Sequence, residues 1–178
     1  HCSDRILGRM GRKTSEADLR RIIGTLREEI PDIALRTTLI TGFPGETEED
    51  HEKMMAFVNE MEFTRLGVFT YSPEEGTPAA EMPDQVPEET KEQWRDEIMA
   101  LQQEISYDLN SAMIGKQLRV IVDGYLYKDE MYMCRSYMDA PGIDGCVFAA
   151  SEEELLSGDF IDVKITDFNE YDLIGERV

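Results

Sequence analysis

Residues 33–72 follow a strand–helix–strand pattern with short connections, and this pattern limits the possible folds more than any other feature of the chain. The apolar runs IALRTTLI and RLGVFTYS each predict a strand. Between them, TEEDHEKMMAFVNEME has apolar side chains at helical spacing, and Thr47 and Asp50 at its start have the spacing of a capping box. Because the connections are short, the two strands are expected to be parallel, as in a doubly wound fold or a (β/α) barrel.

Two more helices are predicted on either side of this unit. The stretch SEADLRRIIGTLREEI begins with Ser15 and Asp18 at capping-box spacing and ends before Pro31. Its apolar side chains share one helical face: Leu19, Ile22, Ile23, Leu26 and Ile30. A longer helix from Pro87 to about Ala112 carries apolar side chains at spacings of three and four: Trp94, Ile98, Leu101, Ile105 and Leu109.

After Gly115 the pattern changes to short strands separated by turn residues: KQLRVIVDGYLY, MYMCRSYM, DFIDVKITDF and YDLIGERV. Apolar side chains alternate along these runs, which is typical of strands with one buried face. About 60 residues of this kind predict a small antiparallel barrel or sandwich. We therefore place a domain boundary near residue 115, with an α/β domain over 1–114 and an all-β domain over 115–178.

The chain is strongly acidic throughout. The formal net charge is −20, and residues 115–178 alone hold fourteen Asp and Glu against six Lys and Arg, a net charge of −8. Nucleic-acid phosphates bind clustered Lys and Arg, so an acidic surface is expected to repel them and to attract a basic protein. Solubility is the commoner explanation of such a charge, so charge by itself names no partner.

The strand at 33–40 is unusual because it carries an arginine. Side chains alternate along a strand, so Arg36, Thr38 and Ile40 share one face and the neighbouring residues face the other way. A buried arginine needs an anionic partner. That partner is either a protein carboxylate or the carboxylate or phosphate of a cofactor, and the glycine-rich turn GFPGE lies at the end of the strand where barrels bind ligands.

Three stretches resemble a known family: HCSDRILGRMGRK, RTTLITGFPGETEEDHEKMMAFV and SPEEGTPAAEMPDQVP. They are similar to the later half of the radical-SAM domain in the methylthiotransferases. The resemblance implies a partial parallel (β/α) barrel followed by an OB-like β-barrel, the TRAM domain, which holds the substrate. It also implies that Arg36, Thr38, Ile40 and Gly42 border S-adenosylmethionine, with Arg36 paired to an acidic or polar part of that cofactor.

The stretch RSYMDAPGIDGCV resembles the branch of this family that methylthiolates the β-carbon of an aspartate in ribosomal protein uS12, a strongly basic protein. Gly142 replaces a glutamate that is usual there, whereas Asp139 and Asp144 remain. With Arg135, these two aspartates are the candidate substrate-binding residues, and the acidic β domain suits a basic protein. Two alternatives stay open: a tRNA adenosine methylthiotransferase, for which the chain lacks a basic stripe, and a non-catalytic TRAM-type binding module.

The family also needs cysteines that this chain does not have. Its chemistry uses two [4Fe–4S] clusters, one of them bound by a CxxxCxxC loop, together with S-adenosylmethionine. Cys2, Cys134 and Cys146 have no such spacing. The resemblance therefore implies a C-terminal fragment of a longer enzyme, with no catalytic residue of its own and no turnover alone.

The remaining expectations concern metals and location. His1 and His51 have no ligand-like neighbours in sequence, so we expect both to be solvated and no metal site to form. No apolar run is long enough for a membrane span, no secretory signal is evident, and the three widely separated cysteines favour a reducing, cytoplasmic compartment. The sequence does not indicate the oligomeric state.

Overall fold

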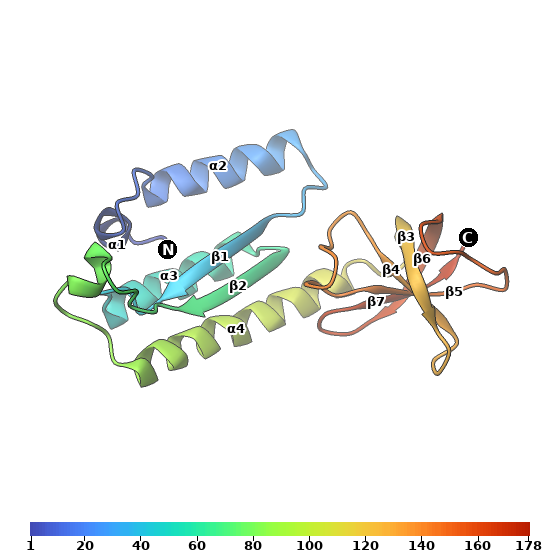
Figure 1. Cartoon of the computed structure of the whole chain (residues 1–178). Coiled ribbons are helices and arrows are strands. Elements are labelled where there is room, and N and C mark those ends of the chain that lie inside the picture. The colour runs from blue at the N-terminus through green and yellow to red at the C-terminus, as the bar shows by residue number, and fades with distance from the viewer. The chain divides into compact units, whose positions relative to one another are not determined.

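The computed structural model describes every residue from His1 to Val178. Contacts group the chain into two compact units, His1–Gln102 and Gln103–Val178, which are described separately (Figure 1). The division falls inside the long helix α4 (Glu88–Ser111), so the last turns of that helix group with the β strands. The domain boundary near residue 115 stays a prediction. No helix combines the length and the hydropathy that crossing a membrane requires.

The first unit contains the expected strand–helix–strand pattern. Its elements, in chain order with α4 last, are α1 (Asp4–Arg9), α2 (Glu16–Glu29), β1 (Arg36–Thr41), α3 (Glu48–Met61), β2 (Arg65–Thr70) and the 3-10 turn η1 (Pro78–Glu81). Strands β1 and β2 are parallel and pair from Arg36 opposite Arg65 to Thr41 opposite Thr70. The parallel pairing predicted from the short connections is confirmed.

Both predicted capping boxes form. Ser15 caps α2 with Asp18, and Thr47 caps α3 with Asp50, each serine or threonine accepting a backbone N–H while the aspartate accepts one in return. The apolar face predicted for α3 is buried: Met54, Phe57, Val58 and Met61.

Fewer apolar side chains of helix α2 are buried than its sequence predicts. Ile23 is buried, whereas Ile22 and Ile30 are 40% and 50% exposed. Leu19, Ile23 and Leu26 line one cavity, so α2 presents a narrow stripe and leaves the two flanking isoleucines outside it.

The second unit is a closed five-stranded barrel, ordered β3-β4-β5-β7-β6. Its strands are β3 (Gln117–Leu126), β4 (Met131–Arg135), β5 (Val147–Ala150), β6 (Phe160–Phe168) and β7 (Leu173–Arg177). The barrel is mixed, because β5 pairs with β7 in parallel, from Val147 opposite Leu173, while the other pairs are antiparallel. The sequence did not predict β5, whose four residues are too few to show a period, and closure depends on that parallel pair.

The barrel interior is filled by the alternating apolar side chains of its strands. The fully or nearly fully buried set includes Leu118, Val120, Val122, Tyr132, Cys134, Val147, Ile161, Val163, Ile165 and Leu173. The alternation predicted in β3 and β6 is confirmed. A bulge between Val122 and Gly124 shifts the register of β3 against β4, so Tyr125 pairs with Tyr132. Bulges of this kind bend strands, as barrel closure requires.

Candidate functional site

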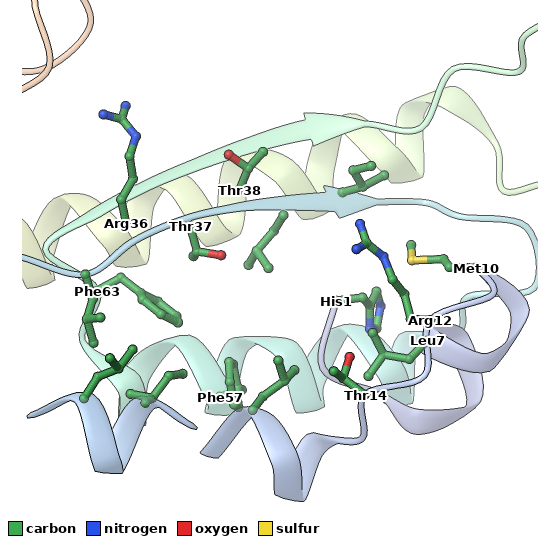
Figure 2. A pocket seen from close by; sticks show the side chains of 16 residues that line it. His1, Leu7, Met10, Arg12, Thr14, Arg36, Thr37, Thr38, Phe57 and Phe63 are labelled. Carbon is green, nitrogen blue, oxygen red and sulfur yellow. The ribbon is translucent and has the colours of Figure 1, made fainter. Parts of the chain in front are cut away.

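The outer face of β1 is the first part of the candidate site. Arg36 and Thr38 are exposed and Ile40 is 39% exposed, whereas Leu39 on the opposite face is buried. Figure 2 shows Arg36 and Thr38 pointing away from α3, while Thr37 points toward it. The structure therefore brings together three of the four residues expected to border a cofactor, on one accessible surface of the sheet.

A cavity of about 320 Å³ lies along β1, and its lining residues include Arg36, Thr38 and Ile40 as well as Leu35, Thr37 and Leu39. Leucine, isoleucine and phenylalanine side chains from α2, β1 and α3 form most of its wall. Polar groups gather toward α1, where Figure 2 shows His1, Arg12 and Thr14. The cavity is thus apolar over most of its length and polar at one end.

The glycine-rich turn after β1 is buried, and its two glycines are close-packed. Gly42 and Gly45 have φ of +74° and +83°, a region that side chains other than glycine rarely adopt. A Cβ on Gly42 would lie 2.1 Å from Cγ of Lys91, and one on Gly45 would lie 2.7 Å from Cζ of Arg9. The turn therefore needs glycine for packing as well as for backbone conformation, and Gly42 lies beneath a lysine side chain.

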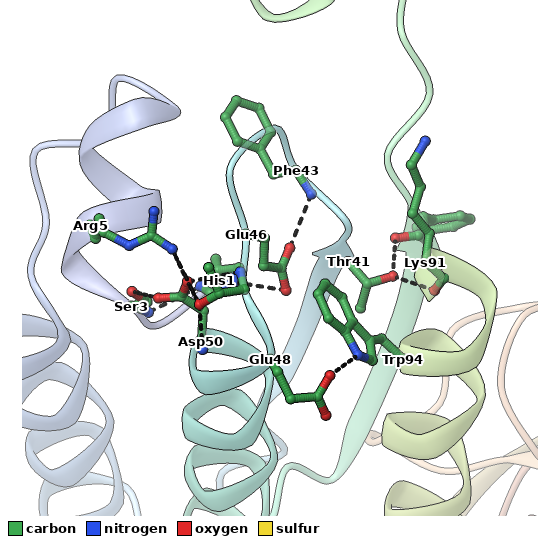
Figure 3. Close-up of polar contacts among 12 residues, drawn as sticks. His1, Ser3, Arg5, Thr41, Phe43, Glu46, Glu48, Asp50, Lys91 and Trp94 are labelled. Carbon is green, nitrogen blue, oxygen red and sulfur yellow. Dashed lines mark hydrogen bonds and ion pairs between the residues drawn. The ribbon is translucent and has the colours of Figure 1, made fainter. Parts of the chain in front are cut away.

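Lys91 of α4 connects the ends of both strands. Its Nζ donates to the carbonyl of Tyr71, just beyond β2, at 2.9 Å and lies 3.0 Å from Oε2 of Glu88. Its backbone carbonyl accepts the Thr41 hydroxyl at 3.1 Å, at the end of β1 (Figure 3). The lysine is 4% exposed. No signal in the helix pattern distinguished it from the other charged residues of α4, and only its contacts identify it.

Polar contacts also fix the start of α3 against the N-terminal segment. Glu46 accepts the backbone N–H of Phe43 at 3.0 Å, and its other oxygen lies 3.2 Å from Nε2 of His1 (Figure 3). Asp50 accepts the Ser3 hydroxyl at 2.6 Å and pairs with Arg5. Burial would raise the pKa of Asp50, but hydrogen bonds from Ser3, Thr47 and Arg5 lower it to about 2. Asp50 is therefore an ionised structural anchor.

The two histidines are not solvated, so that expectation is wrong. The His1 side chain is fully buried against Glu46. His51 is 2% exposed, stacks on Trp94 with ring centroids 5.1 Å apart, and has Nε2 2.7 Å from Oε2 of Glu97. His51 precedes Met54 by three positions, so the helical period already placed it on the buried face of α3. The expectation that His51 is solvated overlooks this helical period.

In the barrel, the three candidate substrate-binding residues stabilise their own surroundings. Arg135 forms a bidentate pair with Asp123, with distances of 2.6 and 3.0 Å. Asp139 accepts the Ser136 hydroxyl at 2.5 Å, and Asp144 accepts the backbone N–H of Ala140 at 2.7 Å. Their part in substrate binding stays a prediction.

The cysteines do not suit an iron–sulfur cluster. Cys2 and Cys134 are fully buried, and burial raises the pKa of each thiol to about 12, whereas cluster ligation uses thiolates. No group of three His, Cys, Asp or Glu side chains is placed to hold a metal ion. The residues present therefore do not fit a cluster. The accessible face of β1 carries groups that can contact S-adenosylmethionine, and this role stays a prediction.

Comparison with known proteins shows which proteins this chain is similar to. Residues 114–178 match the TRAM domain model. The ribosomal protein uS12 methylthiotransferase RimO of Lachnoclostridium phytofermentans is 54% identical over 175 residues, which is 98% of this chain and 40% of that protein. The RimO proteins of Geobacter sulfurreducens and Carboxydothermus hydrogenoformans are 50% and 48% identical over all of this chain, which covers 40% and 41% of their lengths.

Over nearly its whole length the chain is similar to RimO proteins. It spans about two-fifths of the length of the curated relatives it matches. The parallel β1–β2 pair with its helices is consistent with part of a radical-SAM fold, and the closed barrel is the TRAM domain. The family resemblance seen in the sequence is thereby confirmed over the whole chain.

Proposed function

We propose that this chain is the C-terminal part of a RimO-type enzyme that methylthiolates the β-carbon of an aspartate in ribosomal protein uS12. The observation that carries the proposal is 54% identity, over 98% of the chain, to a protein named as a uS12 methylthiotransferase. S-adenosylmethionine and two [4Fe–4S] clusters would supply the radical chemistry and the methyl group in the intact enzyme. The chain by itself would be inactive and cytoplasmic.

The residues of β1 would bind and orient the cofactor. Arg36 carries a positive charge on the accessible face, which suits a carboxylate, and Thr38 adds a hydroxyl beside it. Ile40 would supply apolar contact, and Gly42 would contribute only backbone, since Lys91 packs against its Cα. In the full-length enzyme, Arg36→Ala should weaken S-adenosylmethionine binding about tenfold or more, whereas Arg12→Ala should not. Unchanged affinity for Arg36→Ala would remove this residue from the cofactor site.

The barrel would bind the protein substrate. Its net charge of −8 suits a strongly basic protein and disfavours tRNA. Asp139, Asp144 and Arg135 remain candidates for this contact on the segment between β4 and β5 or beside it.

Calorimetric titration of the chain with purified uS12 at about 150 mM salt tests the proposed substrate. A tRNA anticodon stem-loop and an unrelated basic ribosomal protein are the controls. Saturable binding to uS12 alone supports the proposal. Preference for the RNA would favour a tRNA methylthiotransferase, and equal binding to both basic proteins would show that the acidic surface carries no specificity.

A further inference from the structure

One end of the barrel gathers three segments that are far apart in the sequence. Strand β3 ends at Leu126 and β4 begins at Met131, so the 127–130 turn lies at this end. Strands β5 and β7 run parallel and finish together, with Ala150 opposite Glu176. The turn between β6 and β7, residues 169–172, lies at the opposite end, because β6 pairs antiparallel with both β3 and β7.

Three tyrosines form a connected row at this end. Tyr132 is 7% exposed and its hydroxyl accepts the backbone N–H of Leu155 at 3.1 Å. Its ring contacts Tyr125, with centroids 4.7 Å apart, and Tyr125 contacts Tyr127 edge-on at 5.1 Å. Tyr127 is 88% exposed. The row therefore ends in the ring of Tyr127, which contacts Tyr125 but is otherwise exposed.

A hollow of about 650 Å³ lies at the same end and is lined largely by carboxylates. Its charged lining residues are Glu130, Glu152, Glu153, Glu176 and Arg177. Arg177 pairs with Glu153 at 2.5 Å, so the lining keeps a clear negative excess. The backbone carbonyl of Glu153 also accepts the Tyr132 hydroxyl at 3.4 Å, which ties the wall of the hollow to the tyrosine row.

An exposed aromatic face beside carboxylates recognises cations. Arginine and lysine bind over tyrosine rings and pair with carboxylates, and the two contacts add when the groups are adjacent. A nucleic acid could stack its bases on the same tyrosines, but its phosphates would face the carboxylates of the hollow. Charge therefore decides between these two classes of partner in favour of a protein.

We propose that the Tyr125–Tyr127–Tyr132 row and the glutamate-lined hollow form the docking surface for an arginine- or lysine-bearing segment of the protein substrate. The inference rests on the proposed function, since that function supplies the basic partner, uS12. It places this contact at the end of the barrel opposite the 169–172 turn, so Asp139 and Asp144, between β4 and β5 at the other end, would form a separate contact with the same protein. Tyr127 provides the ring, and Glu152 and Glu176 provide the anions.

Two variants with matched controls test this surface. Tyr127→Ala removes the exposed ring, and Glu152→Lys reverses one charge of the hollow. Tyr107→Ala and Glu104→Lys make the same changes on helix α4, where Glu104 is exposed and Tyr107 is 48% exposed. The unmodified chain and the four variants are titrated calorimetrically with uS12, with a tetra-arginine peptide and with the anticodon stem-loop. Circular dichroism checks that each variant is folded.

Tyr127→Ala should weaken binding of uS12 and of the peptide roughly fivefold, the loss expected for one exposed cation–π contact. Glu152→Lys should weaken both roughly tenfold and reduce the salt dependence, while the two control variants bind as the unmodified chain does. If both variants bind uS12 as tightly as the unmodified chain does, the docking surface is wrong and the proposed function still stands.

The other outcomes separate the two proposals. Peptide binding that the variants weaken, without any binding of uS12, would support the surface chemistry and overturn the assigned substrate. If neither the peptide nor uS12 binds, the docking surface is wrong, and the full-length activity of the enzyme decides the function. Stem-loop binding that depends on Tyr127 would overturn the inference in favour of RNA.

Discussion

The side chain of Lys91 occupies the space in which a Cβ on Gly42 would lie. Such a Cβ would be 2.1 Å from Cγ and 2.9 Å from Cβ of the lysine, and both of these atoms lie close to the helix backbone and cannot swing away. Helix α4 is thereby fixed against the turn that follows β1. Any cofactor role of this turn depends on that contact, because it sets the path of the backbone between β1 and α3.

We expect Gly42→Ala to destabilise the first unit by about 2–4 kcal/mol, from the positive φ together with overpacking against Lys91. Gly76→Ala is the matched control, since Gly76 has φ of +78° and nothing within 4 Å of a new Cβ. Gly76→Ala should lower the free energy of unfolding by only about 1 kcal/mol. Urea unfolding followed by the fluorescence of Trp94, the single tryptophan, measures both. Equal losses in the two variants would show that packing against Lys91 does not matter.

We expect Lys91→Met to lower the free energy of unfolding by about 1–3 kcal/mol. The side chain keeps its length, but the Tyr71 carbonyl loses its hydrogen-bond donor. Lys53→Met is the control. Lys53 is half exposed and pairs with Glu49 on the helix surface, so its replacement should lower the free energy of unfolding much less than Lys91→Met does. The same unfolding experiment applies. Unchanged stability of Lys91→Met would mean that the methylenes, and not the ammonium group, hold α4 to the turn.

Asp50 should make the first unit sensitive to acid. Its pKa is lowered to about 2 from an ordinary value of 3.8, so its ionised form stabilises the fold above about pH 4 and that contribution is lost as the pH falls toward 2. Asp50→Asn should therefore cost about 2 kcal/mol near neutral pH, and the difference from the unmodified chain should shrink between pH 4 and 2. Urea unfolding at a series of pH values measures this. A difference that is independent of pH would contradict the ionised anchor.

The cysteines should differ in reactivity. Cys2 and Cys134 are fully buried with pKa raised to about 12, while Cys146 is only half-buried, although burial raises its pKa as well. Because the thiolate is the reacting form, iodoacetamide at mildly alkaline pH should modify Cys146 first. Mass spectrometry should find one label on the folded chain and three labels in denaturant. Early labelling of Cys2 would show that the N-terminal segment opens.

Much of the fold is encoded locally and could be predicted. The capping boxes at Ser15 and Thr47 form, the apolar face of α3 is buried, and the alternation of β3 and β6 fills the barrel. These features depend on residues a few positions apart, so the period of the sequence contains them. The acidic charge and the family motifs could likewise be recognised from the sequence alone.

Other features are decided by contacts between distant residues. Strand β5 has no period to detect, and it exists because β4 and β7 pair with it on either side. The sequence predicts substrate contacts for Asp139 and Asp144, whereas their hydrogen bonds to nearby loop groups depend on how the chain turns between β4 and β5.

The sequence by itself determined helices α2, α3 and α4 and every strand except β5, because helix caps and hydrophobic periods act over a single turn or pleat. Only the tertiary structure decided that Lys91 packs on Gly42, that His51 stacks on Trp94, and that three tyrosines meet a glutamate-lined hollow at one end of the barrel. Each of these contacts joins residues from separate elements. Their free energy comes from burial and pairing that exist only after the elements have packed, so no local pattern records them.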